Sequence, residues 1–598
     1  MTSMSNILLE QPLLILVSTI VVSVVLAWSL SLFRQRSTWQ DRNKSVSPGR
    51  RQRSYSFTSQ GMVLGVFPDH VQNPETIINA AIFFTTTKNT TNTNTTMNEG
   101  CPSVEDIAKL VVTPMLSYDR LSHIPCKDDQ QLRPSKNTNY TPQDLIRTIP
   151  IEIPNEYWNN AQKDNANQED INDMVYKAIF EHLQDPLTEG RNDLPWWEIL
   201  VFPVVVPQPN NHVGRLPQSA VVLRIHHSLA DGISLVHVFS NIITNLQGEP
   251  VQSLLKTTTS KPSSTTTSTS SSKTTTTAAT IKKRPPKKTF LQTIWSLLKE
   301  TIHVLTLAMS PFDDDIVFRK SIHGTMVHSN NRSYVIFPSI PLSFIKDLKN
   351  AANMTVNDIL MTAVSQAIYD YCQSQNCPLV TDSTTNDNTT QTKKKPIQCR
   401  ALLPVALPRP PEELQDKSTA LRNYWSLVST DIGIGCGPDI LTRLHYIHDR
   451  TSEIKASPRA LVQLLIQNSL PNVLPIQLSQ QTVYDTFCRH SLVFSNVPGP
   501  TEPCLFANKI GRGVQMFYAN LIPQIGLLSY AGTVYGNFVL DPNVLPDSQT
   551  LATFYAAALS QLADRLHVKT PRPPQVIQAA HDAKKLLAQA TNVPTNET

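Results

Sequence analysis

One segment of this 598-residue chain constrains the local fold more than any other, a buried strand that leads at once into a helix. Residues 219–225 are β-branched and mostly apolar, which is typical of a strand in a protein interior. Apolar residues then recur at helical spacing from Ile233 to Leu246. The residues between these two patterns must therefore occupy a tight connection between strand and helix.

That connection carries His226, His227, Asp231 and Gly232. Asp231 is placed to cap the helix with its carboxylate, and Gly232 is expected where a side chain would obstruct the backbone. A neutral imidazole, whose ordinary pKa is about 6.5, can take a proton from an alcohol or thiol and later return it. The turn is therefore a candidate general-base site. The alternative is that both histidines are packed polar residues at a strand end and that Asp231 is simply a cap.

Residues 226–232 also resemble the HHxxxDG signature of coenzyme-A-dependent acyltransferases, and other segments resemble the wax ester synthase/diacylglycerol acyltransferase family within that superfamily. Those segments are residues 194–198 (its Pro-Leu-Trp segment), 355–360 (its Asn-Asp motif), 403–405 (its Pro-Val segment), and 493–500, 529–532, 541–542 and 546–547 of its C-terminal domain. Two positions depart from the pattern. Trp196 replaces the usual Leu, and the Arg that normally follows the Pro-Val segment is displaced to Arg409. The resemblance covers roughly residues 105 to 567.

The resemblance implies roles for four residues. His227 would be the general base that deprotonates an acceptor hydroxyl, with His226 as a supporting neighbour. Asp231 would hold the loop through a salt bridge without touching the substrate. Asn357 would place an amide donor near the reaction centre to stabilise the tetrahedral oxyanion. Fatty acyl-CoA would be a co-substrate, and no bound cofactor, metal or covalent acyl-enzyme is expected.

Other motif residues have structural explanations. Thr355, Asn357 and Asp358 precede an apolar helical period, so they are expected to cap a helix, which is compatible with a catalytic role for Asn357. The remaining expectations are a turn that contains Asn496, Pro498 and Gly499, and core positions for Trp196 and Trp197 beside the apolar residues 199–202, with Pro195 as a structural residue of the same motif.

Residues 12–33 form an apolar run that no charge interrupts. A helix of this length rises about 33 Å, enough to cross the hydrocarbon core of a bilayer. A cleaved signal peptide is the rival interpretation, but no Lys or Arg precedes the run and no small-residue cleavage pattern is evident. We therefore favour a single-pass anchor. Basic residues that follow it would place the amino terminus in the lumen and the catalytic body in the cytosol, with the endoplasmic reticulum as the expected membrane; they are Arg34, Arg36, Arg42, Lys44, Arg50, Arg51 and Arg53.

Overall charge and cysteine usage exclude some classes of protein. The net charge is +5 with 17% charged residues, so no nucleic-acid footprint is evident. The 8 cysteines are scattered without CxxC pairs, which indicates free thiols in a reducing compartment rather than a zinc or disulfide framework.

Low-complexity stretches at residues 85–99, 256–280 and 382–395 mark seams in the chain, because such sequences cannot bury enough apolar surface to order themselves. The expected organisation is a lumenal terminus (1–11), the anchor (12–33), a basic juxtamembrane segment (34–60), an N-terminal acyltransferase domain (61–250), a basic linker (251–288), a linking helix (289–310), a C-terminal acyltransferase domain (311–570) with an insertion at 382–395, and a tail (571–598).

The linking helix has a sequence pattern of its own. A basic run precedes it, and its apolar residues fall along one face. Such a helix can lie on an anionic membrane surface or pack between domains of the protein. We favour packing, because apolar stripes are more often core. The apolar residues are Phe290, Leu291, Ile294, Trp295, Leu298, Ile302, Leu305 and Met309.

The resemblance implies an α/β fold like that of chloramphenicol acetyltransferase, in which two halves with mixed sheets meet across a central channel. It implies transfer of a fatty acyl group to a long-chain alcohol, which gives a wax ester, and/or to diacylglycerol, which gives triacylglycerol. The alternatives are an HxxxDG acyltransferase with another acceptor and a catalytically inactive, membrane-tethered lipid-binding protein. Oligomeric state and acyl chain length are not predicted.

Overall fold

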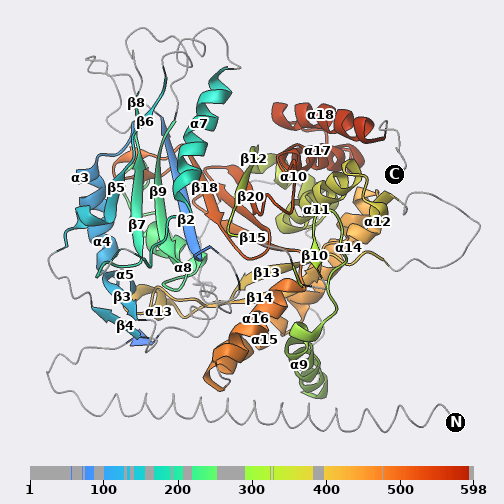
Figure 1. Ribbon diagram of the computed structural model, residues 1–598, viewed down its shortest axis with the longest axis horizontal. Coiled ribbons are helices and arrows are strands. Elements are labelled where there is room, and N and C mark those ends of the chain that lie inside the picture. The colour runs from blue at the N-terminus through green and yellow to red at the C-terminus, as the bar shows by residue number, and fades with distance from the viewer. Residues whose placement is uncertain are drawn as a thin grey trace, which may run out of the picture.

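The computed structural model describes residues 55–56, 71, 74–85, 100–126, 131–134, 140–154, 167–189, 191, 193–205, 218–251, 290–322, 325–326, 329–381, 396–473 and 476–591. These residues form two large mixed sheets with helices packed on their faces, so the expected α/β class is confirmed (Figure 1). The predicted anchor at residues 12–33 lies outside the described residues, as do the low-complexity stretches 256–280 and 382–395. Within the described ranges, no helix has both the length and the apolar composition that crossing a bilayer requires.

The first sheet holds the strand that ends at the histidines, and both of its faces are covered. Along that strand, Val221, Leu223 and Ile225 pack toward one helical layer, whereas Ala220 and Val222 pack toward another. This alternation follows from the two-residue period of a strand and explains the mostly apolar sequence. The sheet order is β18 (Gly513–Tyr518), β2 (Ile77–Thr85), β9 (Gln218–His226), β7 (Trp197–Phe202), β5 (Ile146–Thr148), and the helices are α3 (Val104–Ile107), η1 (Ala108–Val112), α4 (Thr113–Leu116) and α8 (Gly232–Ser240) on one face and α7 (Asn167–His182) on the other.

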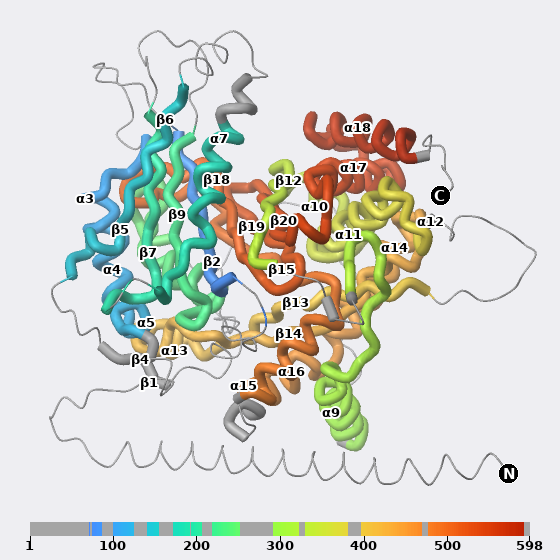
Figure 2. Tube along the Cα trace, in the orientation of Figure 1, coloured from blue at the N-terminus to red at the C-terminus, as the bar shows by residue number. Residues whose placement is uncertain are grey.

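The edge strand β18 comes from the far end of the chain. It pairs antiparallel with β2 along its whole length, from Gly513 opposite Phe83 to Tyr518 opposite Ile78. Figure 2 shows this orange segment running beside the blue one. The predicted boundary at residue 311 therefore does not separate the two sheets, because part of the C-terminal half completes the N-terminal sheet.

The second sheet is built from the C-terminal half and is also covered on both faces. Its order is β12 (Ser333–Pro341), β20 (Thr533–Leu540), β19 (Gln524–Tyr530), β15 (Leu492–Pro498), β13 (Arg400–Ala406), β14 (Trp425–Asp431). The main core lies under α10 (Leu342–Ala352), α11 (Val356–Ser374), α14 (Ile440–Ala456), α17 (Thr550–Arg565) and α18 (Pro574–Thr591), and a second cluster lies under α16 (Ile476–Cys488).

The C-terminal segment corrects a prediction. Residues 571–598 are expected to be a tail, but α18 packs on α17 and buries Val576 completely. Apolar side chains at helical spacing explain the difference, since they add to the core of the second half.

Helix α9 (Phe290–Leu305) corrects another prediction. It contacts α15 (Arg459–Val473) through Val304, which packs on Val462 and Ile466. Most of its apolar stripe nevertheless points away from the protein, with Leu291 76% and Trp295 69% exposed. The expectation that this stripe packs between domains is therefore wrong for most of its described members.

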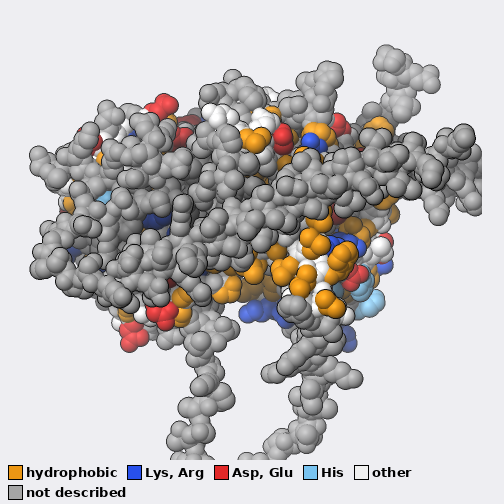
Figure 3. All heavy atoms as spheres, turned by 90° about the horizontal axis from the view of Figure 1, so that it is seen from below, with side chains coloured by type: hydrophobic (Ala, Val, Ile, Leu, Met, Phe, Trp, Pro, Cys, Tyr) orange, Lys and Arg blue, Asp and Glu red, His pale blue; other side chains and the backbone are white. Residues whose placement is uncertain are grey.

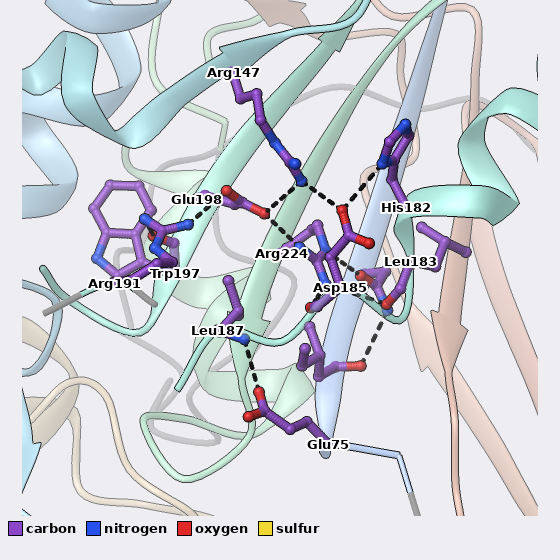
Figure 4. Close-up of polar contacts among 12 residues, drawn as sticks. Glu75, Arg147, His182, Leu183, Asp185, Leu187, Arg191, Trp197, Glu198 and Arg224 are labelled. Carbon is purple, nitrogen blue, oxygen red and sulfur yellow. Dashed lines mark hydrogen bonds and ion pairs between the residues drawn. The ribbon is translucent and has the colours of Figure 1, made fainter. Parts of the chain in front are cut away.

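A buried charged cluster fixes the register of β7 and β9 near the histidines (Figure 4). The fully buried Arg224 guanidinium on β9 donates to Glu198 on β7, and its Nε donates to Asn79 Oδ1 at 3.2 Å. Arg191 contacts the other oxygen of the same carboxylate at 2.5 Å. Burial lowers the pKa of Arg224, and the Glu198 carboxylate opposes that shift. Arg224 also donates to the carbonyl of Leu183, so the segment after α7 is held to the end of β9.

Short elements complete the fold. They are β1 (Tyr55–Ser56), α5 (Asp119–Ser122), β3 (His123–Cys126), β4 (Gln131–Pro134), η2 (Pro142–Leu145), β6 (Ile151–Glu152), β8 (Val204–Val205), η4 (Leu307–Met309), β10 (Ser321–Ile322), β11 (Thr325–Met326), α12 (Pro378–Thr381), α13 (Pro411–Gln415), η5 (Ile434–Cys436), β16 (Leu505–Phe506) and β17 (Lys509–Ile510).

Candidate active site

The predicted strand-to-helix turn is present. β9 ends at His226 and α8 begins at Gly232, with Asp231 as its N-cap. The Oδ1 of Asp231 accepts a hydrogen bond from the amide of Ser234 at 2.7 Å, so the capping prediction is confirmed. The helix ends at Ser240 rather than near Leu246. A Cβ at Gly232 would meet nothing closer than 3.8 Å, so the expectation that a side chain would obstruct the backbone there is wrong.

The two histidines have different surroundings. His226 is buried, with its Nδ1 2.7 Å from the hydroxyl of Ser228 and its ring edge-on to Trp196. His227 lines a cavity between the two halves. β9 ends between the two residues, so His226 remains in the buried strand whereas His227 is the first residue of the turn.

The imidazole of His227 lies between aromatic rings of the second half. Its centroid is 5.2 Å from that of Tyr518 and 5.9 Å from that of Trp425. Burial lowers the pKa of His227, and the nearby Asp231 carboxylate acts in the opposite direction. The ring is therefore neutral at physiological pH and able to accept a proton.

The cavity around His227 measures about 160 Å³ and takes side chains from both halves. Its walls are mainly apolar, with a small set of polar groups on the side of the second sheet, an arrangement typical of ligand sites. The polar residues that share the cavity with His227 and Asp231 are Ser495, Asn496, Asn520 and Gln524.

A loop of the second half clamps the turn that carries His227. The Nδ2 of Asn423 donates to the carbonyl of His227 at 2.8 Å, and the amide of Tyr424 donates to Asp231 Oδ2 at 2.7 Å. The hydroxyl of Ser234 donates to the carbonyl of Arg422 at 2.9 Å. In the described part of the chain, the Asp231 carboxylate thus bonds backbone amides instead of the salt-bridge partner implied by the resemblance.

Asn423 is a site residue that the sequence analysis missed. It is almost fully buried, and no motif residue adjoins it in the sequence. A single Asn before a strand has no spacing signature, so only the tertiary contact with His227 identifies it.

Two arginines support the turn and the start of α8. Arg120, which is buried, donates to the carbonyls of Ser228 at 3.4 Å and Leu229 at 3.3 Å. Burial lowers the pKa of Arg120 to about 10, and the charge of Asp231 opposes that shift. Arg409, the displaced arginine of the Pro-Val segment, donates to the carbonyl of Ala420 at 2.8 Å and to the Ser234 hydroxyl at 3.2 Å.

Asn357 lies at the first turn of α11, outside the walls of the cavity. Its Oδ1 accepts a hydrogen bond of 2.5 Å from Asn496, which does line the cavity. Thr355 and Asp358 form the predicted capping box, in which each side chain bonds the other residue's amide. The structure therefore confirms the capping role for Thr355 and Asp358. It shows no such role for the Asn357 side chain, which reaches the cavity only through Asn496.

These features can be compared with known proteins. Residues 215–360 match the wax ester synthase/diacylglycerol acyltransferase catalytic domain, and residues 421–563 match the WS/DGAT C-terminal domain. The chain is 23% identical over 482 residues to wax ester synthase/diacylglycerol acyltransferase 10 of Arabidopsis thaliana, covering 77% of this chain and 93% of that protein. The chain belongs to the wax ester synthase/diacylglycerol acyltransferase family. It is an acyltransferase.

Further matches align over fewer residues or at lower sequence identity. Wax ester synthase/diacylglycerol acyltransferase 5 of A. thaliana is 24% identical over 465 residues, covering 73% of this chain and 82% of that protein. Among solved structures, the wax ester synthase/diacylglycerol acyltransferase from Marinobacter aquaeolei VT8 aligns with a TM-score of 0.48 at 15% identity, over 85% of this chain and 98% of that chain.

The remaining motif residues of this family member lie around the site. The predicted turn at Asn496 and Pro498 is wrong. β15 continues through Pro498 and pairs with β19, so both residues lie in a strand. Gly499 follows it, where a Cβ would collide with the carbonyl oxygen of Ser529. Trp197 is fully buried, as expected, and donates to the carbonyl of Leu121 at 2.8 Å, and Pro195 is buried beside it.

A second cavity of this acyltransferase adjoins the first. It measures about 150 Å³ and is lined almost entirely by apolar side chains of the first sheet, α8 and the β15–β18 region. Ile78, Gly232 and Met516 line both cavities. An apolar space thus begins beside the candidate base.

Proposed function

We propose that this acyltransferase moves a fatty acyl group from acyl-CoA to the hydroxyl of a long-chain alcohol, which gives a wax ester, and/or of diacylglycerol, which gives triacylglycerol. The observation that carries the proposal is the apolar cavity that shares Ile78, Gly232 and Met516 with the His227 cavity. An apolar chain placed there would lose contact with water while its reactive end lies beside the imidazole.

In the proposed mechanism the neutral His227 ring takes the proton of the acceptor hydroxyl as its oxygen attacks the thioester carbonyl. The new C–O bond forms a tetrahedral oxyanion, for which the amide of Asn496 is the proposed donor and Asn357 its positioning residue. The intermediate then collapses, the C–S bond breaks, and the protonated ring returns the proton to the departing thiolate. Asp231 and Asn423 act by positioning, since both bond the turn that carries His227.

An acceptor panel tests this proposal. Purified protein is given labelled palmitoyl-CoA with hexadecanol, with diacylglycerol or with a short-chain alcohol, and the esters are separated and counted. Ester formation with hexadecanol or diacylglycerol, lost in the His227→Ala variant while the protein stays folded, is the expected result. Undiminished ester formation by that variant would remove the proposed base, and lipid binding without any ester would favour the binding-protein alternative.

The proposal includes the membrane. Both acceptors partition into bilayers, so residues 12–33 are proposed as a single-pass anchor in the endoplasmic reticulum with the catalytic body in the cytosol. Alkaline carbonate extraction of cell membranes should retain the full chain and release a chain that lacks residues 1–34. Release of both would contradict the anchor.

A further inference from the structure

Helix α9 is amphipathic, but its orientation is the reverse of that in an ordinary surface helix. Its acidic residue Glu300 faces the protein, only 3% exposed, and pairs with Arg459 of α15 at 2.7 Å. Successive helical residues are about 100° apart, which puts Leu291, Leu298 and Ile302 on the face opposite Glu300. These residues are exposed, as are Ile294 and Trp295 beside them.

The exposed face extends past the end of the helix. Met309 and Phe312 are also exposed, and the guanidinium of Arg489 lies 4.3 Å from the Phe312 ring centroid. Figure 3, which views the molecule from the side on which α9 lies, shows hydrophobic side chains gathered over one area with Lys and Arg side chains beside them. We call this surface the α9 face; it comprises Leu291, Ile294, Trp295, Leu298, Ile302, Met309 and Phe312.

Basic residues that directly precede α9 in the sequence, together with Lys299 on the helix, point to the occupant of this face. The sequence directly before α9 contains Lys282, Lys283, Arg284, Lys287 and Lys288, and Lys299 is exposed on the helix itself. A second copy of the chain docked through the same surface would bring two of these basic runs together, because a two-fold interface pairs like with like. An anionic lipid surface instead attracts such residues.

We infer that the α9 face rests on the surface of an anionic bilayer, with its aliphatic side chains and Trp295 at the boundary between headgroups and acyl chains. Trp suits this position because its ring is apolar and its N–H remains hydrogen-bonded to the polar side. The contact is separate from the proposed anchor at residues 12–33 and from the acceptor that the enzyme uses. It would hold α15 and the second half of the molecule against the membrane.

The test follows Trp295 itself in the full-length protein. Tryptophan emission and its quenching by dibrominated phosphatidylcholine are recorded for the native chain and for Trp295→Phe, with vesicles of phosphatidylcholine alone or with added phosphatidylserine. The difference between the two proteins isolates Trp295, because any other membrane-bound segment contributes to both. The expected result is a blue-shifted, quenched Trp295 signal with anionic vesicles and a weaker effect with neutral ones.

Two double variants provide a matched comparison. Leu291→Gln with Leu298→Gln removes two apolar side chains from the α9 face and should raise the vesicle concentration for half-maximal Trp295 quenching about tenfold or more. Leu379→Gln with Ile577→Gln removes two side chains, 46% and 45% exposed on α12 and α18, and should leave it unchanged. A Trp295 signal that is the same with and without vesicles would overturn the inference. A Trp295 signal that is already blue-shifted without lipid would also overturn it. Such a signal would mean that another part of the chain covers the α9 face or, if the shift depends on protein concentration, that a second copy does.

Discussion

At the scale of single residues, the site depends on how one imidazole is held. His227 is half-buried beside the rings of Tyr518 and Trp425, and its backbone carbonyl accepts a hydrogen bond from Asn423. Burial removes water from the ring and so disfavours its charged form. The same packing therefore fixes both the position of the candidate base and its protonation state.

This environment predicts the pH dependence of ester formation. The base must be neutral to act, and its pKa is lowered from the ordinary value of 6.5, so the acid limb of kcat/KM should be centred below pH 6.5. Asp231→Asn removes the charge that opposes the shift, so the acid limb should move to lower pH. The pH profiles of kcat/KM for the native enzyme and for Asp231→Asn, measured with the same substrates, test this expectation. Titration of the substrates affects both profiles equally. An acid limb centred at or above pH 6.5 in the native enzyme would contradict the expectation.

The contact between Asn496 and Asn357 predicts unequal effects of two similar substitutions. Asn496 lines the cavity, so Asn496→Ala should lower kcat by about 10²-fold through loss of an oxyanion donor. Asn357→Ala leaves Asn496 in place without its 2.5 Å partner and should cost about tenfold or less. Steady-state rates with one acyl-CoA and one alcohol measure both. A larger loss in Asn357→Ala would restore Asn357 as the donor.

At the scale of elements, buried polar contacts hold strands and loops at the site in register. Glu198 on β7 serves both Arg224 on β9 and Arg191 before β7, and all three side chains are largely removed from solvent. The loop at Arg422–Tyr424 holds the start of α8 in a similar way. Turns that must present a catalytic group precisely are thus fixed by hydrogen bonds from neighbouring elements.

Breaking the charged cluster should destabilise the first half. Glu198→Gln leaves Arg224 buried without its carboxylate, and we expect the free energy of unfolding to fall by about 3–5 kcal/mol. Asp185→Asn is the matched control, because Asp185 binds Arg147 from a position 35% exposed and its loss should cost about 1 kcal/mol or less. Denaturant titration of the two variants measures both losses of unfolding free energy. Equal losses would mean that burial of the Arg224–Glu198 pair does not add to its stabilising effect.

At the scale of the whole molecule, the two halves share a sheet. β18 completes the first sheet from the C-terminal half, and the His227 cavity takes walls from both halves. The site therefore exists only when both halves are present, whatever the covalent connection between them.

A cleavable chain tests this view. A specific protease site placed within residues 256–280 allows the backbone to be cut after folding. We expect the two fragments to stay together on gel filtration without denaturant, because β18 remains paired with β2, and to retain ester formation. Fragments that separate at once would show that the shared strand does not hold the halves together.

Local features and the family are readable from the sequence alone. The strand at residues 219–225, the helical period that follows it and the caps at Asp231 and Thr355 depend on neighbouring residues. Pattern and propensity therefore suffice to predict them. The ordered motifs likewise indicated the family that the comparisons confirm. These predictions succeed because each rests on residues a few positions apart.

Contacts between distant residues follow from the tertiary packing and not from local sequence patterns. Asn423 reaches His227 across 196 positions, β18 reaches β2 from the other half, and Asn357 reaches the cavity only through Asn496. The outward direction of the α9 stripe is a similar case, since a helical period marks an apolar face without saying what covers it. Contacts of this kind depend on how both halves pack, and that packing has no local signature in the chain.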